Sequence, residues 1–220
     1  MAKKIHATAQ QIYDMLMGED WASSEGKITI ELLGNAVVLN DKSIIGNALQ
    51  DWLAAYLDRN GIYYRVQDNT QEFPDFFLNE DNKSGLLELK TFDYSQGANF
   101  DIANFEAYCE SIKTKQYRLD ADYLIIAYTL DNGVLRVQKI WLKKIWEIGA
   151  SSNRFPVKCQ VKRDMIYNIR PAVCSSWNAE RRSFNSREDF VRALYETQKQ
   201  YHKTKETADE WFTEVMLGLH

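Results

Sequence analysis

The stretches Phe73-Pro-Asp-Phe-Phe77 and Leu86-Leu-Glu-Leu-Lys-Thr-Phe92 are short apolar runs on either side of the polar turn Asn79-Glu-Asp-Asn-Lys-Ser84. Each run predicts a strand, at 73–78 and 85–92, and the turn could make the two strands antiparallel neighbours. Because side chains alternate between the faces of a strand, Glu88 and Lys90 share one face and Leu87 and Leu89 the other. Two opposite charges therefore lie inside an otherwise apolar strand.

The helices and strands in the rest of the chain can be predicted from the spacing of apolar residues. Helical spacing predicts helices at 8–17, 44–59, 102–112, 187–201 and 208–217, with Ser43 and Ser186 as N-caps of the second and fourth. Strands are predicted at 27–33 and 36–39 around a Gly34-Asn35 turn, and at 62–66, 123–129 and 134–141. The run at 123–129 is continuously apolar, which is typical of a strand covered on both faces. We expect an α/β fold with a mixed central sheet flanked by helices.

The length and composition predict one domain. A chain of 220 residues with 45% hydrophobic residues can bury one substantial core, and no Pro/Gly-rich linker divides it. Within the domain 1–220 we expect a catalytic core at about 43–130, a basic region at about 136–187 and C-terminal helices at about 187–218. No apolar run approaches the roughly 20 residues that cross a bilayer, so we expect a cytoplasmic protein without a membrane partner.

The distribution of charge is uneven. A net charge of −4 argues against a nucleic-acid partner, because neutralising phosphates needs a basic surface. Between Arg136 and Arg187, however, twelve Lys or Arg residues stand against three acids, a local balance of +9 that leaves −13 for the rest. Such an island is either a solvated basic face or a surface for phosphates.

Asp75 and Glu88 have the chemistry of a cation site. An antiparallel pairing of their strands would bring both carboxylates within reach of one Mg²⁺ ion, which prefers oxygen ligands and could also take the carbonyl of Leu89. The metal would offset charge on a phosphodiester and activate water, and Lys90 would position or help deprotonate that water. The alternative is a structural pair, in which Glu88 and Lys90 are matched with neighbours at a sheet edge.

The pattern of an acid, any residue and a lysine is not specific by itself. It occurs also at Glu25-Gly-Lys27 and Asp81-Asn-Lys83, both in polar turns. The pattern at 88–90 differs because both charges lie within an apolar strand, where an unpaired charge is costly.

Pro74-Asp75 followed by Glu88-Leu89-Lys90 resembles the signature of the PD-(D/E)xK nucleases. That resemblance implies a restriction-endonuclease-like mixed sheet, two metal-binding acids and a catalytic lysine. Longer stretches resemble the NgoBV/NlaIV family of type II restriction enzymes: Ile45-Gly-Asn-Ala-Leu-Gln-Asp-Trp52, Asn69-Thr-Gln-Glu-Phe-Pro-Asp75, Tyr117-Arg-Leu-Asp-Ala-Asp-Tyr123, Lys158-Cys-Gln-Val-Lys-Arg163 and Tyr167-Asn-Ile-Arg-Pro171. The family resemblance implies double-stranded DNA as substrate, a palindromic GGNNCC site, a homodimer and a cognate DNA methyltransferase.

Two further groups of residues are candidates for the same activity. Many relatives add a polar residue from the preceding helix, and Asn47 or Gln50 occupies that place; a solvated face is the alternative. In the basic region, Lys158, Gln160 and Lys162 alternate, so that an extended segment would present them on one side. The candidate DNA-binding residues are Lys158, Gln160, Lys162, Arg163, Asn168, Arg170, Arg181 and Arg182.

Three functions fit these residues. The first is a Mg²⁺-dependent, sequence-specific endonuclease. The second is a repair or recombination nuclease of the same fold that recognises DNA structure. The third is a DNA-binding module whose acidic pair is structural, which predicts binding without cleavage.

Overall fold

The computed structural model describes residues 4–69 and 72–219. Thr70 and Gln71, two positions of the stretch 69–75 quoted above, lie outside the described residues. The chain forms two compact units, each built from two separate stretches: Met1–Gly97 with Asp122–Leu142, and Ala98–Ala121 with Lys143–His220. These are the first and the second unit. The single domain expected from the sequence stays a prediction.

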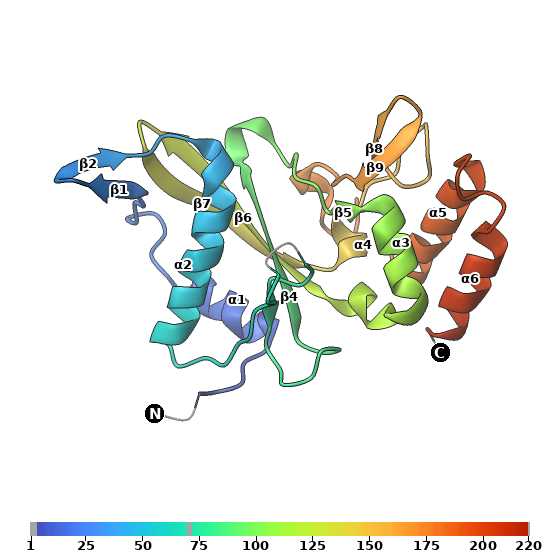
Figure 1. The fold of residues 1–220 in the computed structure, drawn as a ribbon, viewed down its shortest axis with the longest axis horizontal. Coiled ribbons are helices and arrows are strands. Elements are labelled where there is room, and N and C mark those ends of the chain that lie inside the picture. The colour runs from blue at the N-terminus through green and yellow to red at the C-terminus, as the bar shows by residue number, and fades with distance from the viewer. Residues whose placement is uncertain (1–3, 70–71, 220) are drawn as a thin grey trace. The chain divides into compact units, whose positions relative to one another are not determined.

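The first unit contains a sheet with the strand order β3-β4-β6-β7 (Figure 1). Its strands are β3 (Phe76–Phe77), β4 (Leu86–Asp93), β6 (Asp122–Asp131) and β7 (Val134–Lys143). β3 pairs antiparallel with β4, and β4 pairs parallel with β6. The predicted mixed sheet and the antiparallel pairing of the first two strands are therefore confirmed.

One face of this sheet carries the core of the first unit. The helices α1 (Ala9–Met17) and α2 (Ile45–Arg59) bury their apolar sides against Leu87 and Leu89 of β4. In α2 the buried residues Ile45, Leu49, Leu53 and Leu57 recur at every fourth position, which places them on one side of a helix. The face of β4 with Leu87 and Leu89 is thus the helix-covered face.

A two-stranded ribbon follows α1. Its strands β1 (Thr29–Leu32) and β2 (Asn35–Val38) pair antiparallel, with Ile30 opposite Val37 and Leu32 opposite Asn35. The turn consists of Leu33 and Gly34, with φ of 50° and 77°. The predicted turn Gly34-Asn35 is therefore wrong by one residue, because Asn35 pairs with Leu32 and belongs to the second strand.

Three other sequence predictions for local structure differ from the fold. The strand predicted at 62–66 is not formed. Only two of its residues pair with another segment, each in an isolated bridge: Ile62 with Ile5, and Arg65 with Phe77. The predicted N-cap Ser43 is also wrong, because the N-cap position of α2 is Ile44, which makes no side-chain cap hydrogen bond. Asp41 instead caps the 3₁₀ turn Lys42–Ile44 before the helix, where its carboxylate accepts from the Ser43 N–H at 2.8 Å.

The helix predicted at 102–112 begins later, as α3 (Phe105–Thr114). Asn104 is its N-cap, because its side-chain oxygen accepts from the Ala107 N–H at 3.0 Å. Residues Ala103–Asn104 form the short strand β5 instead. The start of this helix is thus set by its cap and not by its first apolar residue.

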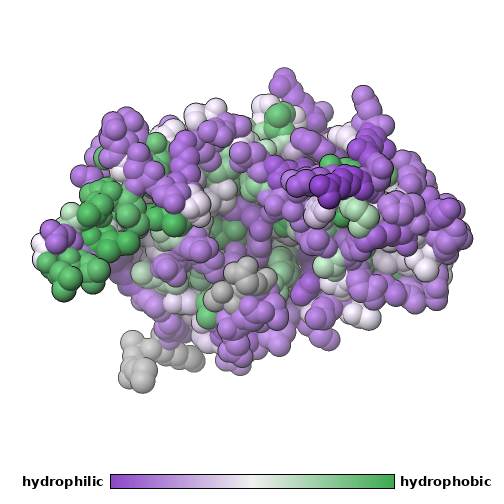
Figure 2. Space-filling model, turned by 45° about the horizontal axis from the view of Figure 1, so that its top comes forward, coloured by the Kyte–Doolittle hydropathy of each residue, from purple (hydrophilic) through white to green (hydrophobic). Residues whose placement is uncertain are grey.

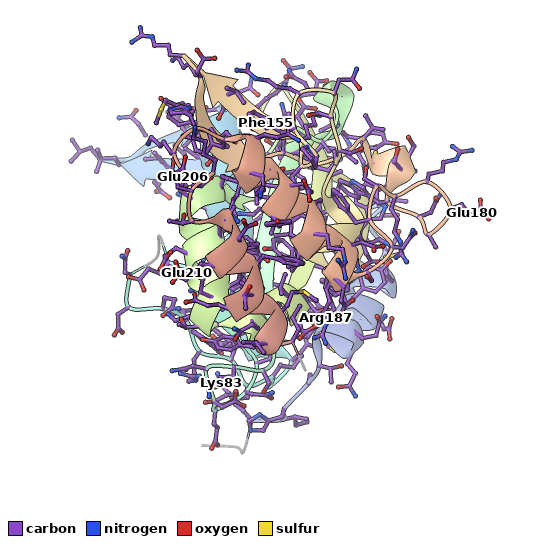
Figure 3. All side chains as sticks on the ribbon, turned by 90° about the vertical axis from the view of Figure 1, so that its right-hand side faces the viewer. Lys83, Phe155, Glu180, Arg187, Glu206 and Glu210 are labelled. Carbon is purple, nitrogen blue, oxygen red and sulfur yellow. The ribbon has the colours of Figure 1, made fainter. Side chains whose placement is uncertain are left out.

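The second unit combines a small sheet with helices. The sheet has the order β5-β9-β8, with β8 (Cys159–Lys162) and β9 (Met165–Ile169) as an antiparallel hairpin. The helices are α3, α4 (Ile145–Ile148), α5 (Arg187–Gln200) and α6 (Ala208–Leu217). α5 and α6 run side by side in Figure 3, which labels Arg187 on the first and Glu210 on the second. Ser186 caps α5 as predicted, since its hydroxyl accepts from the Asp189 N–H at 3.1 Å.

Candidate active site and DNA-binding surface

Backbone hydrogen bonds hold the two candidate carboxylates together at the β3–β4 pair. The Leu89 N–H of β4 donates to Asp75 Oδ2 at 2.7 Å. In return the Asp75 N–H donates to Glu88 Oε2 at 3.2 Å. The antiparallel pairing of β3 with β4 makes this exchange possible, because Asp75 directly precedes β3. Each carboxylate thus accepts a backbone N–H from the other segment, which holds Asp75 beside Glu88 although they are thirteen positions apart in sequence.

Lys90 completes the group. Its Nζ lies 2.9 Å from Glu88 Oε1, and both side chains are mostly buried. They project from the face of β4 opposite the helix-covered face, as strand alternation predicts. A buried lysine and a buried glutamate stay charged at lower cost when each faces the other. The three residues singled out from the sequence are therefore neighbours in space.

The two carboxylates influence each other electrostatically. Burial of Asp75 and the negative charge of Glu88 raise the pKa of Asp75 from 3.8 to about 6. The hydrogen bond from Leu89 and the charge of Lys90 act in the opposite direction on the same pKa, with smaller effect. A bound cation would relieve the repulsion between these two neighbouring carboxylates.

These residues fit a hard divalent cation. Asp75 and Glu88 offer carboxylate oxygens, the donors that Mg²⁺ prefers, and one or two protein carboxylates are a common set for that ion. Within residues 4–69 and 72–219, no group of three or more His, Cys, Asp or Glu side chains forms a richer alternative site. The role of the Leu89 carbonyl as a further ligand stays a prediction.

Asn47 and Gln50 lie on α2, which packs on the helix-covered face of β4. Ile45 and Leu49 hold that helix in the core. The helix backbone at Gly46 lies close to β4, because a Cβ added there would be 3.5 Å from Thr91 Oγ1. Glu88 and Lys90 project from the other face. Asn47 is exposed and Gln50 half-buried, and a part for either in the active site stays a prediction.

The β8–β9 hairpin carries the basic residues of the second unit. Lys158, Gln160 and Lys162 are exposed and Cys159 and Val161 half-buried, as the alternation predicts. Arg163 continues this exposed row into the turn. Hydrophilic side chains cover much of the surface shown in Figure 2.

The turn and the strands of this hairpin add two features. Arg163 and Asp164 form the turn with φ of 51° and 59°, which places the Arg163 side chain at the tip. Across the strands, Asn168 Nδ2 donates to Gln160 Oε1 at 3.3 Å. Two amides that can contact base edges therefore lie side by side between exposed cations.

Not every cation of the basic region is available to a phosphate. Arg170 pairs with Asp101, and Arg182 lies 3.2 Å from Glu147 and is mostly buried. Among the residues that the structure describes, Lys162, Arg163 and Arg181 make no ion pair. These three are the strongest candidates for phosphate contacts. The sequence could not separate them from Arg170, because Asp101 lies 69 positions away from it.

Within the described part of the chain, helices stay too short or too polar to span a bilayer.

Comparison with known proteins identifies the family of this chain. A family model described as NgoBV restriction endonuclease matches residues 6–219. The type II restriction enzyme NlaIV of Neisseria lactamica is 40% identical over 211 residues, which are 94% of this chain and 87% of that enzyme. The type II restriction enzyme NgoBV of Neisseria gonorrhoeae is 35% identical over 162 residues, 72% of this chain and 92% of that enzyme.

The fold agrees as well. A solved structure of the NlaIV restriction endonuclease matches with a TM-score of 0.87 and 37% sequence identity, over 96% of this chain and 88% of that one. The expected restriction-endonuclease-like fold is thereby confirmed. Because both the family model and two named enzymes match most of its length, the chain belongs to the NgoBV restriction endonuclease family of type II restriction enzymes.

Proposed function

We propose that the protein cuts double-stranded DNA with Mg²⁺, using Asp75, Glu88 and Lys90. The observation that carries this proposal is the mutual hydrogen bonding of these three residues at the β3–β4 pair. A purely structural ion pair would need only Glu88 and Lys90. The third group, a half-buried carboxylate with a raised pKa beside a like charge, is the kind of arrangement found at catalytic sites.

Each residue has a distinct task in the proposed reaction. Bound Mg²⁺ would offset the negative charge on the scissile phosphate and lower the pKa of a bound water. Asp75 and Glu88 supply its protein ligands, and their backbone hydrogen bonds fix the carboxylates before the substrate arrives. Lys90, held by Glu88, positions the attacking water and adds positive charge beside the phosphate. The products are a 3′-hydroxyl and a 5′-phosphate or the reverse, depending on which P–O bond the water opposes.

The β8–β9 hairpin is the proposed DNA reader. Lys162 and Arg163, with Arg181, would contact phosphates, while Gln160 and Asn168 would reach base edges. Lys158, Arg170 and Arg182 complete the proposed binding surface. The resemblance to the NgoBV/NlaIV family supports a palindromic GGNNCC site, which a homodimer reads symmetrically. As part of the same proposal, a cognate methyltransferase protects host DNA in the cytoplasm.

The decisive experiment is cleavage of a plasmid of known sequence. Discrete fragments are expected with Mg²⁺, with ends that lie within GGNNCC, and none with EDTA. A matched plasmid from which every GGNNCC site has been removed serves as the control. Discrete cuts at another sequence would disprove the GGNNCC assignment, and binding without metal-dependent cleavage would disprove the nuclease.

The free cations of the hairpin give a separate prediction. Replacing Lys162 with Ala and Arg163 with Asn is expected to lower the slope of log binding constant against log salt by about 2, because each phosphate contact contributes about 1. Asn is chosen at 163 because it tolerates the positive φ of the turn. Binding to uncut duplex is measured in EDTA across a salt series.

The control for this measurement is Lys199→Ala. Lys199 is an exposed cation on α5, but it pairs with Asp209 at 3.1 Å and should contribute nothing to the salt slope. An unchanged slope in the hairpin variant would remove the hairpin from the DNA-binding surface.

A further inference from the structure

Arg65 is bound to the polar turn that joins β3 and β4. Its guanidinium donates to the Asn79 carbonyl, from Nε at 3.3 Å and from Nη2 at 3.2 Å. Nη2 also donates to the Asp81 carbonyl at 3.0 Å and to Asn82 Oδ1 at 2.9 Å. Lys83 marks this turn in Figure 3. One side chain from outside the hairpin thus contacts three residues of its turn.

The same residue holds β3 itself. The Arg65 N–H donates to the Phe77 carbonyl at 2.9 Å, and the Phe77 N–H donates to the Arg65 carbonyl at 2.8 Å. The guanidinium lies over the Phe77 ring, 4.7 Å from its centroid. Because β3 consists of only two residues, it has few other backbone hydrogen bonds to fix its place. Arg65 therefore ties this short strand to the turn that follows it.

The register of β3 along β4 places the two candidate carboxylates. In this pairing Phe76 lies opposite Leu87. The next position in the same antiparallel register sets Asp75 opposite Glu88. A slip of one residue would turn a side chain to the other face of the sheet, and the form of the turn fixes the register of a hairpin. By holding the turn, Arg65 thus holds the register on which the carboxylate pair depends.

The contact with the Phe77 ring lies on the face of the sheet that carries the carboxylates. Side chains alternate along a strand, so Phe77 and Asp75 project to one side. Phe76, between them, belongs to the core on the helix-covered face. The acceptors of the Arg65 guanidinium are carbonyl and amide oxygens of the turn. Its effect on the carboxylates therefore passes through the backbone.

Arginine is suited to this task by its shape. Its guanidinium is a planar fork with several N–H donors, which can bond separate acceptors while its face rests on an aromatic ring. Lysine carries the same charge on a single nitrogen and cannot do both. Exchanging the two residues at position 65 therefore changes the geometry of the contacts and leaves the charge of the protein unchanged.

We propose that Arg65 is a positioning residue for the cation site: it fixes the register of β3 and so keeps Asp75 beside Glu88. This inference rests on the proposed function, in which these two carboxylates bind Mg²⁺. Two amides report on the arrangement before any metal binds, because the Leu89 N–H donates to Asp75 and the Asp75 N–H donates to Glu88. Both should exchange faster with solvent when the turn is released.

The first test is Arg65→Lys, studied by NMR hydrogen exchange without metal or DNA. The Asp75 and Leu89 N–H groups are expected to exchange about tenfold faster than in wild type, the effect of losing about one net hydrogen bond from the local structure. The Leu135 N–H donates to the Gly26 carbonyl at 2.9 Å in the same unit and should keep its wild-type rate. A loss of overall stability would instead accelerate all three amides.

Two further variants sharpen this test. Arg59→Lys is the matched control, because Arg59 also lies over an aromatic ring, that of Tyr56 at 5.4 Å, but on α2. It should leave both reporter amides unchanged. Asn82→Ala removes one acceptor of Arg65 at an exposed position. It should accelerate the same two amides and add little to Arg65→Lys in the double variant, because both changes act on one contact.

The second test measures the Mg²⁺ concentration that gives half-maximal cleavage. Arg65→Lys is expected to raise it by about tenfold, because the carboxylates are held less firmly before the metal binds. The rate at saturating Mg²⁺ should stay close to that of wild type, since Lys90 and both carboxylates are intact. A role in stability alone would lower the amount of active protein without moving this concentration.

Wild-type exchange at both reporter amides of Arg65→Lys, or equal acceleration at Leu135, would overturn the proposal. So would an unchanged Mg²⁺ requirement in an enzyme that cuts DNA. A wild-type chain that does not cleave would contradict the proposed function instead. The exchange measurement would then still decide whether Arg65 holds the two carboxylates together.

Discussion

Lys90→Ala is expected to slow DNA cleavage by about a hundred- to a thousandfold while binding of uncut duplex persists. The reason is that Lys90 is the one cation within hydrogen-bonding distance of the Glu88 carboxylate among the described residues, at 2.9 Å. Removing a charge that is positioned for the transition state typically has an effect of this size. Single-turnover cleavage of a short duplex measures the rate, and a gel shift in Ca²⁺ measures binding.

Lys42→Ala is a matched control for this experiment. Lys42 also forms an ion pair with an acid of β4, Asp93, but at the far end of the strand from Asp75. Its loss should leave the cleavage rate nearly unchanged. Equal losses in both variants, or a Lys90→Ala protein as fast as wild type, would show that Lys90 has no specific part in the chemistry.

Asp75→Asn is expected to abolish cleavage and also the stabilisation of the protein by Mg²⁺. The asparagine oxygen can still accept from the Leu89 N–H, but the variant loses one of two charged ligands. A ligand at about a hundred times its dissociation constant stabilises a fold by about 2.7 kcal/mol, which raises the melting temperature of a chain of this size by several degrees. Thermal unfolding with and without Mg²⁺ should show that rise in wild type and none in Asp75→Asn.

Without metal, the same variant should be at least as stable as wild type, because the amide no longer repels Glu88. This distinguishes loss of a ligand from damage to the fold. Asp81→Asn is the control: Asp81 begins the second acid-x-lysine pattern, Asp81-Asn-Lys83, but it lies exposed in the turn before β4. It should keep both cleavage and the response to Mg²⁺. A Mg²⁺ response that persists in Asp75→Asn would contradict the proposed cation site.

Local sequence determined the candidate active site. The alternation of Leu87, Glu88, Leu89 and Lys90 sets which side chains share a face. The short polar turn favours the antiparallel pairing of β3 and β4 that the structure has. Both are short-range effects of backbone geometry, so they can be predicted without knowing the rest of the fold. The cap at Ser186 is predictable for the same reason, since its partner is three residues away.

Only the tertiary structure decided the features that depend on distant partners. Arg170 and Arg163 look alike in the sequence, yet Asp101 neutralises the first and leaves the second free, because the partner lies 69 positions away. The ribbon illustrates the same limit. The sequence predicts its two strands but not the exposure of Ile30, Leu32 and Val37, because burial depends on which surfaces the folded chain brings against them. The sequence by itself thus determined which residues meet in the candidate site through short-range geometry, whereas long-range packing decided which charged and apolar residues remain exposed.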